Sequence, residues 1–123
     1  MLGFMRSIAP QYQREGIRTY AICPGTVRTN LLTSGTYDSY PDQYLTPIET
    51  IVSTVRTLIL GGTMTDASGR EVQNSQNYGV AVEIFGKDIY FRDQLEFIND
   101  AMRQICEGSS LKNQERNLIA PTS

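Results

Sequence analysis

The sequence predicts an α/β domain built from two buried parallel strands and three main helices. Two short apolar runs, residues 17–23 and 80–85, each end at a glycine turn, which is typical of strands buried on both faces. Three longer segments carry apolar residues at helical spacing, and they alternate with these runs: residues 2–15, 46–60 and 93–108. Helices alternating with buried strands favour a parallel sheet covered by helices.

The first helix and strand have clear end signals. The helix over residues 2–15 has a broad apolar stripe that includes Leu2, Met5, Ile8 and Tyr12. Pro10 is tolerated inside it as a kink, and Gly16 stands where a left-handed cap ends a helix. The strand over residues 17–23 then ends at Pro24-Gly25, a strong turn signal.

A polar, tyrosine-rich loop over residues 26–45 separates this strand from the second helix. Thr46 is predicted to cap that helix, with Pro47 in its first turn and Glu49 closing a capping box. The apolar positions carry the helix to Gly61-Gly62.

The second half of the chain repeats the pattern more briefly. A turn-rich segment over residues 63–78 leads to the strand over 80–85, which ends at Gly86. A second capping box over Asp93-Gln94-Leu95-Glu96 predicts a helix that ends near Gly108. We therefore expect one domain over residues 1–108 and a polar tail over residues 109–123.

Composition excludes several classes of function. The 123 residues carry a net charge of −2, which argues against a nucleic-acid partner or an anionic membrane surface. No apolar run is long enough for a membrane span, and no secretory signal is expected. Cys23 and Cys106 make no disulfide framework, so a cytoplasmic location is the simplest inference. Histidine is absent, and we therefore expect no metal site.

The string from Gly16 to Thr29, together with Leu2 to Pro10, resembles the short-chain dehydrogenase/reductases, close to their hydroxyprostaglandin-dehydrogenase-like members. The resemblance implies a truncated Rossmann-like fold, the C-terminal half of a family member. Leu2 to Pro10 would be the second half of the family's catalytic helix. The chain would then begin just after the family's Tyr-x-x-x-Lys motif.

The family's cofactor motifs are missing from this sequence. There is no Gly-x-x-x-Gly-x-Gly turn and no Tyr-x-x-x-Lys; Tyr12 is followed at that spacing by Gly16. By the resemblance, four residues keep positions that touch the nicotinamide carboxamide in the family, as a vestigial site: Pro24, Gly25, Val27 and Thr29. We expect the chain to bind no NAD(P) cofactor by itself.

A ligand site is expected where the strands end, because ligands in open α/β sheets bind outside the carboxyl ends of the strands. The loop over residues 30–45 corresponds to the family's substrate lid. The candidate catalytic residues in this loop are Tyr37, Asp38, Tyr40, Asp42 and Tyr44. The candidate substrate-binding residues are Thr26, Arg28, Thr29 and Tyr90. The alternative is that the tyrosines pack the underside of the loop and the acids are solvated.

Two further side chains leave alternatives open. Glu83 is a lone acid in an apolar strand; it is either an edge or interface residue, or a buried carboxyl with a raised pKa. Cys23 is more typical of a small buried hydrophobe than of a nucleophile.

Two strands alone do not make a stable sheet, and the first has an unpaired edge. We therefore expect oligomerisation to complete the sheet, in a homodimer whose interface includes residues 2–15 and the first strand.

Three hypotheses on function follow. The favoured one is a cofactor-independent enzyme that isomerises, cyclises or eliminates from a small organic substrate by acid–base chemistry. The alternatives are a non-catalytic assembly subunit and the downstream half of a split NAD(P)-dependent dehydrogenase.

Overall fold

The computed structural model describes residues 1–73, 78–110 and 112–113, and it divides the chain into two compact units, Met1–Asp93 and Gln94–Ser123. The elements of the first unit run in the order α1 (Leu2–Arg14), β1 (Tyr20–Pro24), α2 (Ser34–Tyr37), the 3₁₀ helix η1 (Asp42–Tyr44), α3 (Ile48–Leu60), β2 (Met64–Thr65), β3 (Glu71–Val72), β4 (Val80–Phe85) and β5 (Asp88–Arg92). The second unit contains α4 (Asp100–Gly108). The boundary expected at residue 108 stays a prediction, as does the polar tail, most of which lies outside the described residues.

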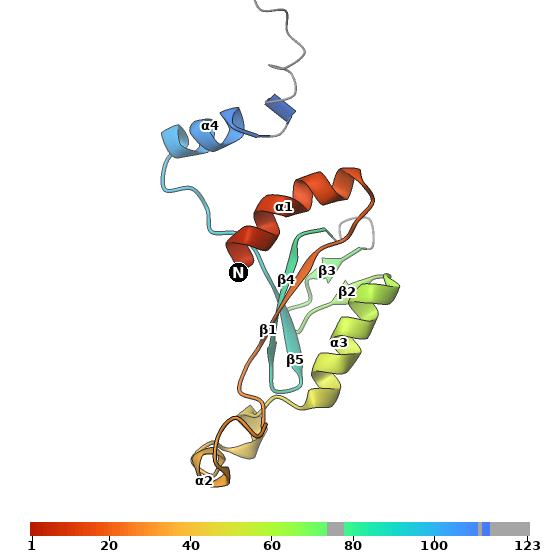
Figure 1. Cartoon of the computed structure of the whole chain (residues 1–123), viewed down its shortest axis with the longest axis vertical. Coiled ribbons are helices and arrows are strands. Elements are labelled where there is room, and N and C mark those ends of the chain that lie inside the picture. Colours follow the sequence, from red (N-terminus) through yellow and green to blue (C-terminus); the bar gives the residue numbers. More distant parts are fainter. Residues whose placement is uncertain (74–77, 111, 114–123) are drawn as a thin grey trace, which may run out of the picture. The chain divides into compact units, whose positions relative to one another are not determined.

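The main sheet has three strands in the order β1-β4-β5 (Figure 1). β1 pairs with β4 in parallel, with Tyr20 opposite Val80, so the predicted parallel pair is confirmed. β4 pairs with β5 antiparallel, with Glu83 opposite Tyr90. The α/β class is confirmed and the arrangement fits a part of a Rossmann-like fold. The expectation of only two strands is wrong, because the chain turns back at Gly86 into a third.

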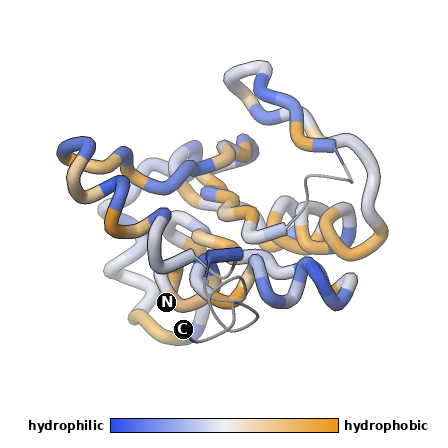
Figure 2. Tube along the Cα trace, turned by 90° about the horizontal axis from the view of Figure 1, so that it is seen from above, coloured by the Kyte–Doolittle hydropathy of each residue, from blue (hydrophilic) through white to orange (hydrophobic). Residues whose placement is uncertain are grey.

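The hydrophobic core lies between one face of this sheet and α3. Side chains alternate along a strand, so Val82 and Ile84 point to the same face and are fully buried there. Phe91 of β5, Leu58 of α3 and Met64 complete the buried cluster. Figure 1 shows α1 and α3 on either side of the sheet, and hydrophobic residues alternate with hydrophilic ones along the helices in Figure 2. The core therefore fixes β1 and β4, whose carboxyl ends carry the candidate site.

The first helix ends as the sequence predicts. Gly16 has a φ of 73°, a left-handed conformation that favours glycine. Its N–H bonds the carbonyl of Gln13, and the N–H of Ile17 bonds the carbonyl of Tyr12 at 2.8 Å. These two bonds are those of a Schellman motif. Pro10 lies inside α1, as predicted.

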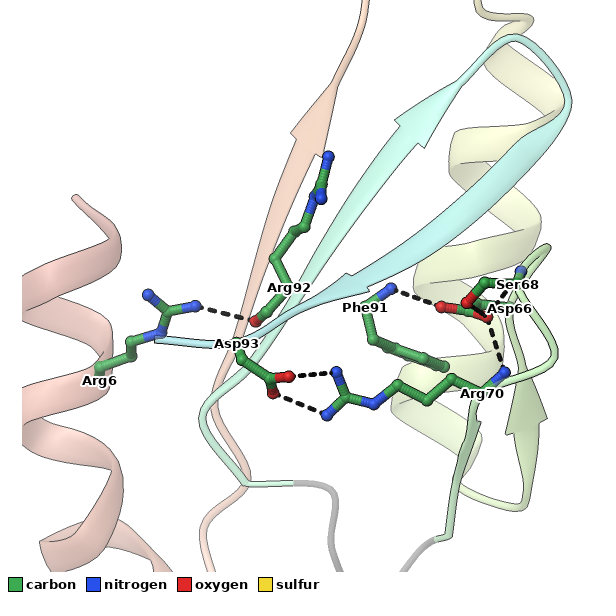
Figure 3. Close-up of polar contacts among 7 residues, drawn as sticks. All are labelled: Arg6, Asp66, Ser68, Arg70, Phe91, Arg92 and Asp93. Carbon is green, nitrogen blue, oxygen red and sulfur yellow. Dashed lines mark hydrogen bonds and ion pairs between the residues drawn. The ribbon is translucent and has the colours of Figure 1, made fainter. Parts of the chain in front are cut away.

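The outer edge of β5 is covered by the turn that joins β2 to β3. The backbone N–H of Ala67 donates to the carbonyl of Ile89 at 3.0 Å, and the N–H of Phe91 donates to Oδ2 of Asp66 at 3.1 Å (Figure 3). Among the described residues, no strand pairs with the outer edge of β1. Completion of the sheet at that edge by oligomerisation stays a prediction.

The helix of the second unit begins later than predicted. Its N-cap is Asn99, whose Oδ1 accepts a hydrogen bond from the N–H of Met102 at 2.8 Å. The predicted start at the capping box of residues 93–96 is wrong, because Asp93 instead binds Arg70 in the first unit. The predicted end near Gly108 is confirmed.

Candidate functional site

Two chain segments are fastened to the carboxyl end of β4. The N–H of Gly25, just after β1, donates to the carbonyl of Ile84 at 2.7 Å. The N–H of Thr46, just before α3, donates to the carbonyl of Thr26 at 2.7 Å. The turn after β1 and the segment that leads into α3 therefore lie side by side on the end of the sheet.

Thr46 is the central residue of this arrangement. It is buried, its Oγ1 donates to the carbonyl of Ile84 at 3.4 Å, and it accepts from the N–H of Gly86 at 3.2 Å. The prediction that Thr46 caps α3 is wrong, since the N-cap is Pro47 and no side chain caps the helix. A buried N–H needs an acceptor, and the Thr46 hydroxyl supplies one to the turn between β4 and β5.

Gly25 is needed here for close approach rather than for its backbone angles. A Cβ atom at this position would lie 3.1 Å from Oγ1 of Thr46 and 3.3 Å from the carbonyl oxygen of Ile84. A side chain here would therefore require the Thr46 hydroxyl or the Ile84 carbonyl to move by a few tenths of an ångström.

A small open pocket of about 260 Å³ lies beside this junction. We call it the edge pocket, and eight residues line it: Val27, Arg28, Asp42, Leu45, Thr46, Pro47, Ile48 and Glu49. Nη2 of Arg28 lies 3.4 Å from Oδ1 of Asp42, and both side chains are exposed. The edge pocket thus joins apolar walls to a charged pair at the carboxyl end of the parallel strands, where open α/β sheets bind ligands.

Tyr37 lies inside the loop rather than on the pocket wall. Its side chain is buried, and its hydroxyl accepts from the backbone N–H of Thr29 at 3.0 Å. The guanidinium of Arg28 lies 5.2 Å from the centre of the ring. The hydrogen bonds from Thr29 lower the pKa of the Tyr37 phenol, and the charge of Arg28 acts in the same direction. Tyr37 therefore holds the start of the loop through its hydroxyl, and its ring packs against the guanidinium of Arg28.

The other predicted catalytic residues do not converge. Asp38 and Tyr40 are exposed and line no part of the edge pocket. Tyr44 is half-exposed and its ring lies 6.0 Å from that of Phe85. Of the five, only Asp42 lines the edge pocket. A catalytic role for any of them stays a prediction.

The predicted substrate-binding residues are divided between two places. Arg28 lines the edge pocket, while Thr26 and Thr29 use backbone groups to hold the loop. Tyr90 lies in β5 opposite Glu83 and is not part of the pocket. Of the positions that the family resemblance assigns to the nicotinamide, Val27 lines the pocket.

Glu83 and Cys23 lie in one row across the sheet. Glu83 is in the central strand and pairs with Arg92 at 2.5 Å, so it is not a residue of the sheet edge. Cys23 is half-buried in β1 opposite Glu83.

In the part of the chain that the structure describes, no group of three or more Cys, Asp and Glu residues is placed to hold a metal ion. The same residues include no helix of the length and apolarity that a membrane span needs.

Sequence reasoning missed the second wall of the pocket. Leu45, Pro47, Ile48 and Glu49 were interpreted as the end of a loop and the start of a helix. The available signal was the predicted helix start directly after the loop, because a helix that begins there brings its first turn to the edge where that loop starts.

The comparisons with known proteins gave one curated relative. "Short-chain dehydrogenase/reductase prx7" from Penicillium rubens is 43% identical over 119 residues, covering 93% of this chain and 42% of the relative. No family model matches the chain, and no solved structure gives a significant match. The chain therefore spans less than half the length of that relative. Along nearly its whole length it corresponds to part of a short-chain dehydrogenase/reductase, which confirms the resemblance seen in the Gly16 to Thr29 string.

Proposed function

We propose that this chain provides the small-molecule-binding edge of an enzyme related to the short-chain dehydrogenase/reductases, with the ligand held in the edge pocket. The observation that carries the proposal is the junction of Gly25, Thr46 and Ile84, because it fixes both pocket walls to the end of the sheet. Sites built on rigid elements hold a ligand with more precision than sites on free loops.

The charges of the pocket indicate the class of ligand. The lining contains one guanidinium, that of Arg28, and two carboxylates, those of Asp42 and Glu49, so it carries a net charge of −1. Such a lining disfavours an anionic ligand. Apolar walls beside a hydrogen-bond donor suit a neutral organic molecule that carries a carbonyl or hydroxyl oxygen.

The size of the pocket limits the ligand further. Its volume of about 260 Å³ is close to the lower end of the range for small-molecule sites, roughly 300–1,000 Å³. A single ring with one polar substituent fits this space. A whole dinucleotide does not.

A titration followed by amide NMR shifts tests the proposal. Cyclohexanone, nicotinamide and benzoate serve as probes because they present a ketone, a carboxamide and a carboxylate. We expect the two neutral probes to shift residues 25–28 and 45–49, and benzoate to bind more weakly. Arg28→Gln should weaken the neutral probes, while Arg14→Gln, an exposed change on α1, should leave them unaffected. Shifts confined to other parts of the chain would contradict the proposal.

A second candidate function is acid–base turnover without a cofactor, favoured by the Arg28–Asp42 pair at the pocket. In this reaction the Asp42 carboxylate takes a proton from the carbon next to a substrate carbonyl. Arg28 donates a hydrogen bond to the carbonyl oxygen as it becomes an enolate. In a β,γ-unsaturated carbonyl substrate the enolate extends into a dienolate, and return of the proton to its γ-carbon shifts the double bond into conjugation and completes an isomerisation.

Exchange of the substrate's α-protons for deuterium distinguishes the two candidates. Exchange catalysed by the chain alone, lost in Asp42→Asn and retained in Asp38→Asn, would support acid–base turnover. Binding of the neutral probes without exchange would leave the pocket as a binding site only.

The split-dehydrogenase and assembly hypotheses are supported by other observations. An upstream half supplied by a separate chain accords with the 42% coverage of the relative, and activity restored by mixing the two halves would support it. An assembly role draws on the outer surface of α3.

A further inference from the structure

The carboxylate of Asp42 is only weakly held by its own side-chain contacts. The side chain is 93% exposed, and its ion pair with Nη2 of Arg28 is long, at 3.4 Å. An ion pair between exposed side chains contributes little, because water screens both charges and each flexible side chain must be ordered. The place of Asp42 at the edge pocket therefore depends on the backbone that carries it.

That backbone is η1, a single 3₁₀ turn that begins at Asp42 and ends at Tyr44. Two hydrogen bonds shape it: the N–H of Tyr44 donates to the carbonyl of Pro41 at 2.9 Å, and the N–H of Leu45 donates to the carbonyl of Asp42 at 3.1 Å. A 3₁₀ helix has poorer hydrogen-bond geometry than an α-helix and occurs in short pieces. One isolated turn of this kind needs a contact with the rest of the fold to keep its place.

The ring of Tyr44 makes such a contact with the ring of Phe85, the last residue of β4. The centres of the two rings are 6.0 Å apart and their planes are inclined by 31°. Aromatic rings attract one another at centre-to-centre distances of about 4.5–7 Å. Each of the two side chains is about half exposed, so the contact lies at the surface of the fold. This ring pair fastens η1 to the end of the sheet.

The turn that starts at Phe85 borders both chain segments that meet at the edge pocket. A Cβ atom at Gly25 would lie 3.4 Å from Cδ2 of Phe85, so the Phe85 ring also lies beside the turn after β1. A Cβ atom at Gly86 would lie 3.3 Å from the carbonyl oxygen of Gln43 in η1. A shift of η1 relative to this turn would therefore alter the pocket itself.

We propose that Tyr44 is a positioning residue of the edge pocket, because the packing of its ring on Phe85 holds Asp42 in place. Asp42 in this place partners Arg28 and thereby sets the preference of the pocket for neutral ligands over anions. The proposal rests on the ligand-binding function proposed above. It gives Tyr44 a role other than the catalytic one predicted from the sequence, since the ring makes the contact with Phe85 and the hydroxyl is not needed for it.

The preference for neutral ligands follows from the charge of Arg28. A carboxylate next to the guanidinium offsets its positive charge, so an anionic ligand gains little from approaching it. When η1 shifts and Asp42 moves away, the guanidinium is left without this partner and attracts anions. A neutral ligand has no comparable gain. Loss of the ring contact therefore changes the ratio of the two affinities as well as their size.

The ratio of the Kd of benzoate to the Kd of cyclohexanone, measured by the NMR titration at pH 7, tests the proposal. Tyr44→Ala and Phe85→Ala should each lower this ratio about threefold, and the double variant should lower it no further than either change alone. Tyr44→Phe keeps the ring and should keep the ratio of the unmodified chain. Tyr40→Ala, at a similarly exposed tyrosine of the same loop, is the matched control and should also keep it.

An Asp42 variant shows whether Tyr44 acts through this carboxylate. Asp42→Ala, at an exposed position, should lower the ratio about as much as Tyr44→Ala does. Adding Asp42→Ala to the Tyr44→Ala variant should then change the ratio little further. A residue that only stabilised the loop would leave the effect of Asp42→Ala unchanged.

Three results would overturn the proposal while leaving the proposed function intact. The first is an equal loss of affinity for both probes in Tyr44→Ala, with the ratio unchanged. The second is a lowered ratio in Tyr44→Phe, which would assign the role to the hydroxyl, and the third is an equal effect of Tyr40→Ala. If the probes instead cause no shifts at residues 25–28 and 45–49 of the unmodified chain, the proposed function fails and this proposal fails with it.

Discussion

The Asp66 carboxylate accepts a hydrogen bond from the backbone N–H of Phe91 at 3.1 Å, in the place where a neighbouring strand would offer a carbonyl group (Figure 3). Its other oxygen accepts from the N–H and the hydroxyl of Ser68 and from the N–H of Arg70. One side chain thus closes the edge of β5 and fixes the turn between β2 and β3. The sheet is protected at this edge, since exposed strand edges invite association with other strands.

Asp66→Asn is predicted to destabilise the chain at neutral pH. Four hydrogen-bond donors point at the carboxylate, and an amide group replaces one accepting oxygen by a donor. The midpoint of thermal unfolding should fall by about 5 °C. Ser68→Ala, which removes only the 2.6 Å bond from the hydroxyl, should have a smaller effect in the same direction.

The lowered pKa of Asp66 predicts how the free energy of unfolding depends on pH. The Ser68 hydroxyl, joined by three backbone N–H groups, lowers the pKa of Asp66 from about 3.8 to about 2. A lowered pKa in the folded state means that the ionised carboxylate stabilises the fold above pH 3.8. That contribution is lost as the pH falls from 3.8 towards 2. Urea unfolding at several pH values should show the difference between Asp66→Asn and the unmodified chain shrinking over this window; a constant difference would show that ionisation of Asp66 is irrelevant.

The ion pair between Arg70 and Asp93 is predicted to matter much less. The two bonds are short, 2.6 and 2.7 Å, and Arg70 lowers the pKa of Asp93. Both side chains are nevertheless exposed to solvent. A double-mutant cycle with Arg70→Gln and Asp93→Asn should give a coupling of about 0.5 kcal/mol, decreasing in high salt. A salt-independent coupling several times larger would contradict this estimate.

The elements that sequence reasoning predicted correctly are those with strong local signals. Helical spacing over residues 2–15 and the cap at Gly16 depend only on neighbouring residues, and the structure confirms both. The pairing of β1 with β4 follows from two apolar runs that have no other way to bury both faces.

The elements that it missed depend on contacts between distant residues. β5 is a short alternating strand, and Ile89 and Phe91 are apolar only on the side that faces α3, so nothing local separates it from a loop. Thr46 looks like a helix cap in sequence, but its hydroxyl is needed 40 residues later by Gly86. For the same reason, sequence reasoning predicted the wall of the edge pocket that contains Arg28 and Asp42 but missed the wall formed by the start of α3.

Thr46→Val is predicted to destabilise the turn between β4 and β5, which lies beside the edge pocket. The substitution keeps the size of the side chain but leaves the buried N–H of Gly86 without its acceptor. Leaving such a group unsatisfied costs about 1–3 kcal/mol, which denaturant unfolding will measure. Hydrogen exchange should accelerate at Gly86, and Thr46→Ser should stay close to the unmodified chain. Equal stability of the Val and Ser variants would show that the hydroxyl has no such role.

The chain by itself is predicted to bind neither NADH nor NADPH with sub-millimolar affinity. Its sequence has no glycine-rich turn to receive the pyrophosphate at a helix N-terminus. The pyrophosphate would therefore find no row of backbone N–H donors at a helix N-terminus. Calorimetric titration with both cofactors measures this, with nicotinamide alone as the control for the pocket.

We predict that Tyr37 holds the loop in position and that Asp42 takes part in the reaction. Tyr37→Phe removes the acceptor for the N–H of Thr29, so the loop should open and its hydrogen exchange should accelerate. Because Arg28 rests on the Tyr37 ring, and the ring remains, probe binding in the edge pocket should weaken only slightly. Asp42→Asn keeps the shape of the pocket and removes the carboxylate beside Arg28.

If acid–base turnover takes place, Asp42→Asn should therefore lower kcat by about a hundredfold or more, with an unchanged melting temperature. Tyr37→Phe should instead act mainly on KM. Tyr40→Phe and Asp38→Asn, which change exposed groups outside the pocket, are the matched controls. Full activity in Asp42→Asn combined with loss of activity in either control would remove the edge pocket from the reaction and place the chemistry elsewhere in the loop.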